Sequence, residues 1–141
     1  MSNLQPLSYV VERLQNLSQS KHDDTIFTGT SFMDKYGQKE EIAFAGGDIQ
    51  HAYSKVNTVY KMAKDHNKSK NKFKINNSSS INTEVLVGNL EIAIDKIDSA
   101  MNRLNQYDTD KIQKLIDELK QIKESISKHK EQIESTGIIS L

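Results

Sequence analysis

The C-terminal part of the chain carries an apolar pattern that repeats every seven residues without a slip. Its members alternate spacings of three and four residues, and they are Ile112, Leu115, Leu119, Ile122, Ile126, His129 and Ile133. These spacings place the side chains on one narrow stripe of an α-helix, which must be buried against other helices. The pattern predicts a helix that begins near Asp108 and ends at Gly137.

A second stripe precedes the first one, on a helix predicted from Thr83 to Leu104 with Asn82 as its N-cap. Its members are Leu90, Ile94, Ile97, Met101 and Leu104. The phase of the repeat breaks at Asn105–Asp108, which predicts a turn and an antiparallel helical hairpin of coiled-coil type. The turn contains no Gly or Pro. One continuous helix that pairs with a second chain therefore remains an alternative.

Two further helices are predicted in the N-terminal half. The first begins at Pro6 and runs to about Gln19, because apolar residues recur there at helical spacing. The second follows the Gly46-Gly47 pair, with Asp48 as its N-cap, and runs to about His66. Its apolar face consists of Ile49, Ala52, Tyr53, Val56, Val59, Tyr60 and Ala63.

The segment between these helices favours a small β-hairpin near residues 25–45. Thr25–Thr28 is rich in β-branched and aromatic residues, and Asp34–Gly37 resembles a type I turn. Glu41–Ala45 would then be the return strand. A short helix from Phe32 to Ala45 is the competing interpretation, because Phe32 and Tyr36 are four residues apart.

A polar stretch divides the chain into an N-terminal part, residues 1–66, and a C-terminal helical hairpin, residues 83–141. Residues 67–82 are rich in Lys, Asn and Ser, which is typical of a linker or exposed loop. The alternation of lysines from Lys70 to Lys74 also permits a short edge strand with the lysines outward. The whole is expected to be one compact domain, mainly α, built as a helical bundle.

Composition narrows the class of protein further. Only 35% of the 141 residues are hydrophobic, and Cys is absent, so disulfides and thiolate chemistry are excluded. Lys and Arg total 19, of which only Arg13 and Arg103 are arginine, and they balance 19 acids. The abundance of Lys, Asn and Ile indicates an AT-rich genome, such as that of a bacterium or a phage. The N-terminal sequence lacks a signal-peptide pattern, so a cytoplasmic location is expected.

No group of residues matches a catalytic, metal or cofactor motif. His22-Asp23-Asp24 and the pair Asp48 and His51 have metal-ligand side chains but lack further ligands at diagnostic spacing. Gly46-Gly47 precedes a predicted helix but lacks the rest of a phosphate-binding loop. We therefore expect no enzyme activity, no cofactor and no small-molecule ligand.

The stripe from Ile112 to Ile133 supports a non-enzymatic interaction protein: an adaptor, an inhibitor or an assembly subunit. Its helical face would dock a protein partner or another copy of the chain. Ordinary packing inside the chain is the competing explanation. His129 is the one polar member, and it would either lie near a frayed helix end or specify the partner.

Nucleic-acid binding is the alternative function. The segment from Lys61 to Lys74 carries a net charge of +5, and its phosphate-binding residues would be Lys61, Lys64, Lys68, Lys70, Lys72 and Lys74. Phe73 could stack on a base. No arginine lies in this segment to read base edges.

Overall fold

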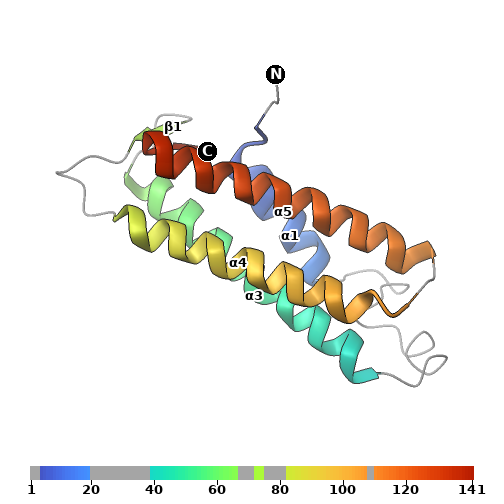
Figure 1. Ribbon diagram of the computed structural model, residues 1–141. Helices are drawn as coiled ribbons and strands as arrows, with labels where there is room; N and C mark the ends of the chain where they lie inside the picture. The colour runs from blue at the N-terminus through green and yellow to red at the C-terminus, as the bar shows by residue number, and fades with distance from the viewer. Residues whose placement is uncertain (1–3, 20–38, 67–71, 75–81, 108–109) are drawn as a thin grey trace.

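The computed structural model describes residues 4–19, 39–66, 72–74, 82–107 and 110–141 (Figure 1). Within these ranges the elements are α1 (Leu7–Gln19), α3 (Lys39–His66), β1 (Lys72–Lys74), α4 (Thr83–Leu104), α5 (Asp110–Thr136) and β2 (Ile138–Ser140). The protein is therefore mainly helical, and its helices pack as a bundle, which confirms the predicted fold class.

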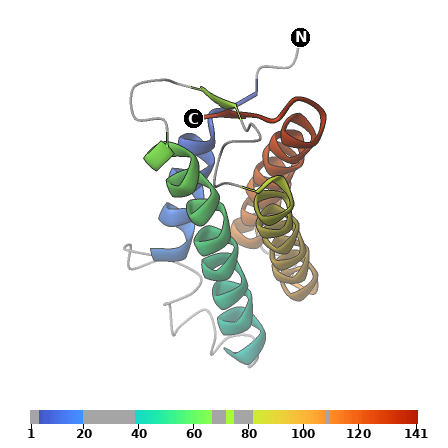
Figure 2. The ribbon, with the colours of Figure 1, turned by 90° about the vertical axis from the view of Figure 1, so that its left-hand side faces the viewer.

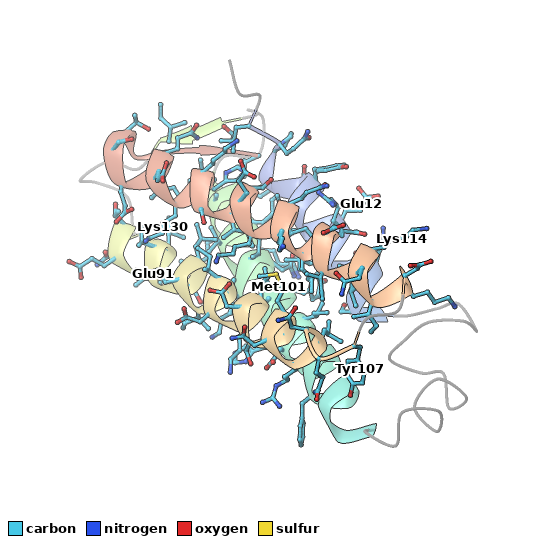
Figure 3. The ribbon with its side chains drawn as sticks, turned by 45° about the vertical axis from the view of Figure 1, so that its right-hand side comes forward. Glu12, Glu91, Met101, Tyr107, Lys114 and Lys130 are labelled. Atoms are coloured by element: carbon cyan, nitrogen blue, oxygen red, sulfur yellow. The ribbon has the colours of Figure 1, made fainter. Side chains whose placement is uncertain are left out.

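Successive helices run in opposite directions, and they follow one another around the bundle in the order α1, α3, α4, α5 (Figures 1 and 2). α4 and α5 thus form the predicted antiparallel hairpin, and the alternative of one continuous helix is wrong. Tyr107 lies at the end of α4 and is only 3% exposed (Figure 3). Its N–H donates to the Leu104 carbonyl at 3.0 Å, which closes the last turn.

The helix ends follow the capping signals of the sequence. The side-chain oxygen of Asn82 accepts a hydrogen bond from the Glu84 N–H at 2.8 Å, so Asn82 is the N-cap of α4. Gly137 has a φ of 70°, and its N–H donates to the Ile133 carbonyl at 2.9 Å. Glycine is favoured there because a side chain strains this left-handed conformation. The Pro6 carbonyl accepts from the N–H groups of Tyr9 and Val10 as α1 begins.

α3 differs from the prediction, because it begins at Lys39 and passes through Gly46-Gly47 without a break. Asp48 is an interior residue and no N-cap, and Glu41–Ala45 is helical rather than a return strand. Thr25–Thr28 and Asp34–Gly37 lie outside the described residues. Each interior glycine costs a helix about 1 kcal/mol. Packing offsets this cost, since Ala45 and Ile49 on either side of the glycines are fully buried.

The polar stretch and the C-terminal residues meet in a two-stranded antiparallel sheet. β1 pairs with β2 in the register Lys72 with Ser140, Phe73 with Ile139 and Lys74 with Ile138. The backbone of Lys72–Lys74 therefore adopts the strand that the lysine alternation permitted. The Gln132 amide donates to the Ile138 carbonyl at 2.9 Å and to the Ser140 hydroxyl at 3.1 Å, which fastens β2 to α5.

One continuous apolar core draws on α1, α3, α4 and α5 and reaches Ile139 of β2. Its largest fully buried side chains are Leu7, Leu14, Ile49, Leu86, Leu90, Ile97, Leu104, Ile112, Leu119, Ile122 and Ile126. Among the described helices, none combines the length and the apolar character that a bilayer crossing requires.

Candidate functional site

The apolar stripe of α5 lies inside the bundle. All seven of its members are at most 7% exposed: Ile112, Leu115, Leu119, Ile122, Ile126, His129 and Ile133. Ile116, which lies outside the heptad pattern, is also buried, because α5 packs against both α1 and α4. The stripe has its packing partners within the chain, and its role as an interface for another molecule stays a prediction.

His129 is fully buried and therefore does not lie at a frayed helix end. Its Nε2 donates to the Gln5 carbonyl at 2.6 Å and so joins α5 to the residues that precede α1. Its Nδ1 is buried and has no hydrogen-bond partner in the part of the chain that the structure describes. Burial lowers the pKa of His129 below the ordinary 6.5, and the hydrogen bond to Gln5 opposes that shift.

The predicted nucleic-acid residues are only partly described. Lys61 and Lys64 lie exposed on α3, and the Lys64 ammonium stands 5.4 Å from the centre of the Tyr60 ring. Lys72, Phe73 and Lys74 form β1, whereas Lys68 and Lys70 lie outside the described residues.

The metal-type residues do not assemble a site within the described ranges, where no three His, Cys, Asp or Glu side chains gather. His22-Asp23-Asp24 lies outside those ranges. His51 is exposed on α3, whereas the Asp48 carboxylate turns to α4. Asp48, which the sequence predicted to be a helix N-cap, instead accepts hydrogen bonds from two side chains of α4.

Asp48 joins α3 to α4 at the outer edge of the bundle. Its Oδ2 accepts a hydrogen bond of 2.7 Å from the Ser99 hydroxyl and one of 3.2 Å from Nε of Arg103. The Arg103 guanidinium also stands 5.0 Å from the centre of the Phe44 ring, in the range of a cation–π contact. These contacts place Asp48 of α3 at the level of Ser99 and Arg103 of α4.

Counting in steps of seven residues from Asp48 and Ser99 shows which other residues of α3 and α4 share a level. Asp48, Lys55 and Met62 follow one another at intervals of seven on α3, as do Val85, Ile92 and Ser99 on α4. Because the helices are antiparallel, equal steps of seven residues from the Asp48–Ser99 hydrogen bond assign Lys55 to the level of Ile92, and Met62 to the level of Val85. We call this outer surface the α3–α4 face. Its residues are Phe44, Asp48, Lys55, Met62, Val85, Ile92, Lys96, Ser99 and Arg103.

The α3–α4 face concentrates the exposed apolar side chains. Within the described part of the chain, four large apolar residues are exposed: Phe44 at 53%, Val85 at 47%, Tyr9 at 42% and Ile92 at 39%. Three of these four belong to the α3–α4 face, and the fourth, Tyr9, lies on α1. The face therefore combines exposed apolar groups with the fixed Asp48–Arg103 ion pair.

The opposite flank of α4 has a different character. Glu91 pairs with Lys130 at 3.4 Å, and Asp98 pairs with Lys123 at 2.7 Å, so the α4–α5 boundary is closed by ion pairs. Figure 3 shows Glu91 and Lys130 on these adjacent helices. The exposed apolar side chains of α4, Val85 and Ile92, thus lie on its α3 side and not on its α5 side.

Sequence reasoning did not find the α3–α4 face, because its residues come from helices whose alignment is a tertiary feature. One signal was present: Val85 and Ile92 are seven residues apart but do not belong to the stripe of Leu90, Ile97 and Leu104. Comparison with protein-family models, curated proteins and solved structures finds no match. The functional argument therefore rests on this chain's own residues.

Proposed function

We propose that this chain is a non-enzymatic protein-interaction protein that binds another protein on the α3–α4 face. The observation that supports the proposal is that Phe44, Val85 and Ile92 lie along one face, when only one other large apolar side chain is exposed among those whose burial the structure describes. Scattered exposed apolar residues are ordinary on protein surfaces, and it is their alignment on one face that favours a binding surface.

The chemistry of the face suits a protein partner. Aromatic side chains and arginine dominate the energetics of interfaces when a partner removes them from water. Phe44 and Arg103 form such a pair, and the hydrogen bond from Arg103 to Asp48 holds the guanidinium in place before binding. Little side-chain entropy would then be lost at this point when a partner docks.

Quantitative affinity capture from the native host tests the proposal. The bait is the full chain, and the test variant carries both Val85→Ser and Ile92→Ser, which remove the apolar contacts without touching the core. We expect a partner that the wild type recovers to be lost from this variant. The matched control is Tyr9→Ser, which removes an exposed apolar side chain from α1.

Circular dichroism must first show that both variants are folded. Recovery of the same proteins in the same amounts by the wild type and the Val85→Ser/Ile92→Ser variant would contradict the proposal. Loss of the partner from the Tyr9→Ser variant alone would move the binding site to α1.

The proposal retains the expected cytoplasmic location, which the lack of a signal-peptide pattern supports, and the expected bacterial or phage origin, which the abundance of Lys, Asn and Ile supports. Nucleic-acid binding by the segment from Lys61 to Lys74 stays an untested alternative. Its test is a mobility shift with generic DNA or RNA at low salt, where phosphate contacts are strongest.

A further inference from the structure

The charges of α4 are sorted between its two flanks. On the α5 side it presents Glu91 and Asp98, and each has a lysine partner on α5. On the α3 side it presents Lys96 and Arg103, seven residues apart. Arg103 has Asp48 of α3 as its carboxylate partner. Lys96 lies one heptad before Arg103, on the same side of α4.

Two lysines share that neighbouring level. A step of seven residues from Asp48 along α3 leads to Lys55, and a step of seven back from Arg103 along α4 leads to Lys96. Because α3 and α4 run in opposite directions, a forward step on α3 and a backward step on α4 lead the same way along the bundle. Each step covers about 10.5 Å. The heptad spacing therefore assigns both Lys55 and Lys96 to the level that follows the Asp48–Arg103 ion pair.

No carboxylate of the described residues neutralises this pair. Neither Lys55 nor Lys96 forms an ion pair within the described ranges. The positions three and four residues away from each lysine on its own helix hold no acid. Both side chains are partly buried, and the exposed side chain of Ile92 lies on the same level. Two cations without a carboxylate partner on one level of the surface favour the approach of an anion.

We infer that the partner of the α3–α4 face is an acidic amphipathic helix, which places a carboxylate between Lys55 and Lys96 and apolar side chains on Ile92 and Val85. The inference rests on the proposed function and specifies its partner. A helix satisfies both requirements, because residues three, four and seven apart on it share one face. Its acidic positions meet the two lysines, while apolar residues one heptad apart meet Val85 and Ile92.

Binding of two designed peptides tests the inference. The first is a helix of about three heptads with a Leu stripe flanked by Glu, and the second has Lys in place of every Glu. Fluorescence anisotropy gives the affinity, and methyl NMR shifts of Val85 and Ile92 give the location. We expect the acidic peptide to shift these methyls and to weaken as salt rises, and the basic peptide to have no effect.

Charge reversal in the protein supplies the second arm. The double variant Lys55→Glu/Lys96→Glu should bind the acidic peptide at least about tenfold more weakly. The matched control, Lys61→Glu/Lys64→Glu, makes the same change of net charge at exposed lysines of α3 outside the face, and it should bind as the wild type does. Equal weakening by both double variants would show only a long-range effect of net charge and would overturn the inference.

Other outcomes separate the inference from the proposed function. If both peptides shift the Val85 and Ile92 methyls equally, an apolar docking face exists but its partner is not acidic. If neither peptide binds while capture still depends on Val85 and Ile92, the acidic helix is the wrong occupant. Generic RNA that binds the wild type but not Lys55→Glu/Lys96→Glu would assign the anion to a phosphate backbone. A dimer that Ile92→Ser dissociates would make a second copy the occupant.

Discussion

At position 129 the apolar stripe of α5 is interrupted by an imidazole whose two nitrogens have different surroundings. Nε2 donates to the Gln5 carbonyl at 2.6 Å, whereas Nδ1 is buried without a partner in the described part of the chain. The sequence predicted that position 129 belongs to the stripe. It could not predict the partner, because Gln5 is 124 residues away along the chain.

The buried imidazole makes stability depend on pH. Protonation would place a hydrogen on Nδ1, which has no acceptor, and burial accordingly lowers the pKa of His129 below 6.5. Between that lowered pKa and 6.5 the unfolded chain binds more protons than the folded one, so stability falls as the pH falls. We expect urea unfolding to show a lower free energy of unfolding at pH 5 than at pH 7.5.

Other titrating groups also change the free energy of unfolding with pH. The contribution of His129 is therefore the difference in this free energy between the wild type and a His129→Leu variant. That difference should change between pH 7.5 and pH 5, with the wild type losing more stability than the variant. Parallel curves for the two proteins would show that His129 does not titrate differently in the folded state.

At pH 7.5 the same His129→Leu substitution should raise the free energy of unfolding by about 1 kcal/mol. It removes a buried nitrogen that lacks a partner, which costs about 1–3 kcal/mol, and it loses one hydrogen bond worth about 0.5–1.5 kcal/mol. The freed Gln5 carbonyl belongs to an exposed residue and can bond to water. Urea unfolding measures the change, and a loss of stability would mean that the bond to Gln5 outweighs the unpaired Nδ1.

Among the elements, those with local capping signals were predicted well. α4 begins after Asn82 and α5 ends before Gly137, as the sequence predicted, because a cap depends on residues within one helical turn. α3 was predicted to begin about nine residues too late, because Gly46-Gly47 locally favours a break. The packing that offsets this preference is tertiary: Ala45 and Ile49 are buried in the core, and Ser99 and Arg103, which bond to Asp48, are 51 and 55 residues away.

Gly47 of α3 leaves room for a gain in stability. A Cβ built on Gly47 has no atom within 4 Å, and the residue is exposed in the helix interior. Gly47→Ala should therefore raise the free energy of unfolding by about 0.5–1 kcal/mol, because alanine loses less backbone entropy in a helix. Thermal and urea unfolding measure this change. A decrease in stability would indicate that the backbone at Gly47 needs the freedom of glycine.

For the whole molecule, the sequence predicted the bundle and its C-terminal hairpin but not the face that we propose to be functional. The buried face of each helix can be predicted from the spacing of apolar residues within that helix alone. The α3–α4 face depends on how two helices are aligned, and residues far apart in the sequence, such as Asp48, Ser99 and Arg103, meet only in that alignment. The stripe of α5 was the stronger sequence pattern, and the structure buries all of it within the chain. The residues with the strongest heptad periodicity therefore form the core, whereas the candidate surface contains apolar residues that lie outside those stripes, such as Val85 and Ile92.

The central claim is that a protein partner contacts the α3–α4 face, and site-specific photo-crosslinking in the native host tests it most directly. A photo-reactive amino acid replaces Ile92 in one version of the chain and Tyr9 in another, since both positions are exposed. We predict a discrete crosslinked protein from position 92 and none from position 9. A crosslinked protein from position 9 alone, or from neither position, would contradict the claim.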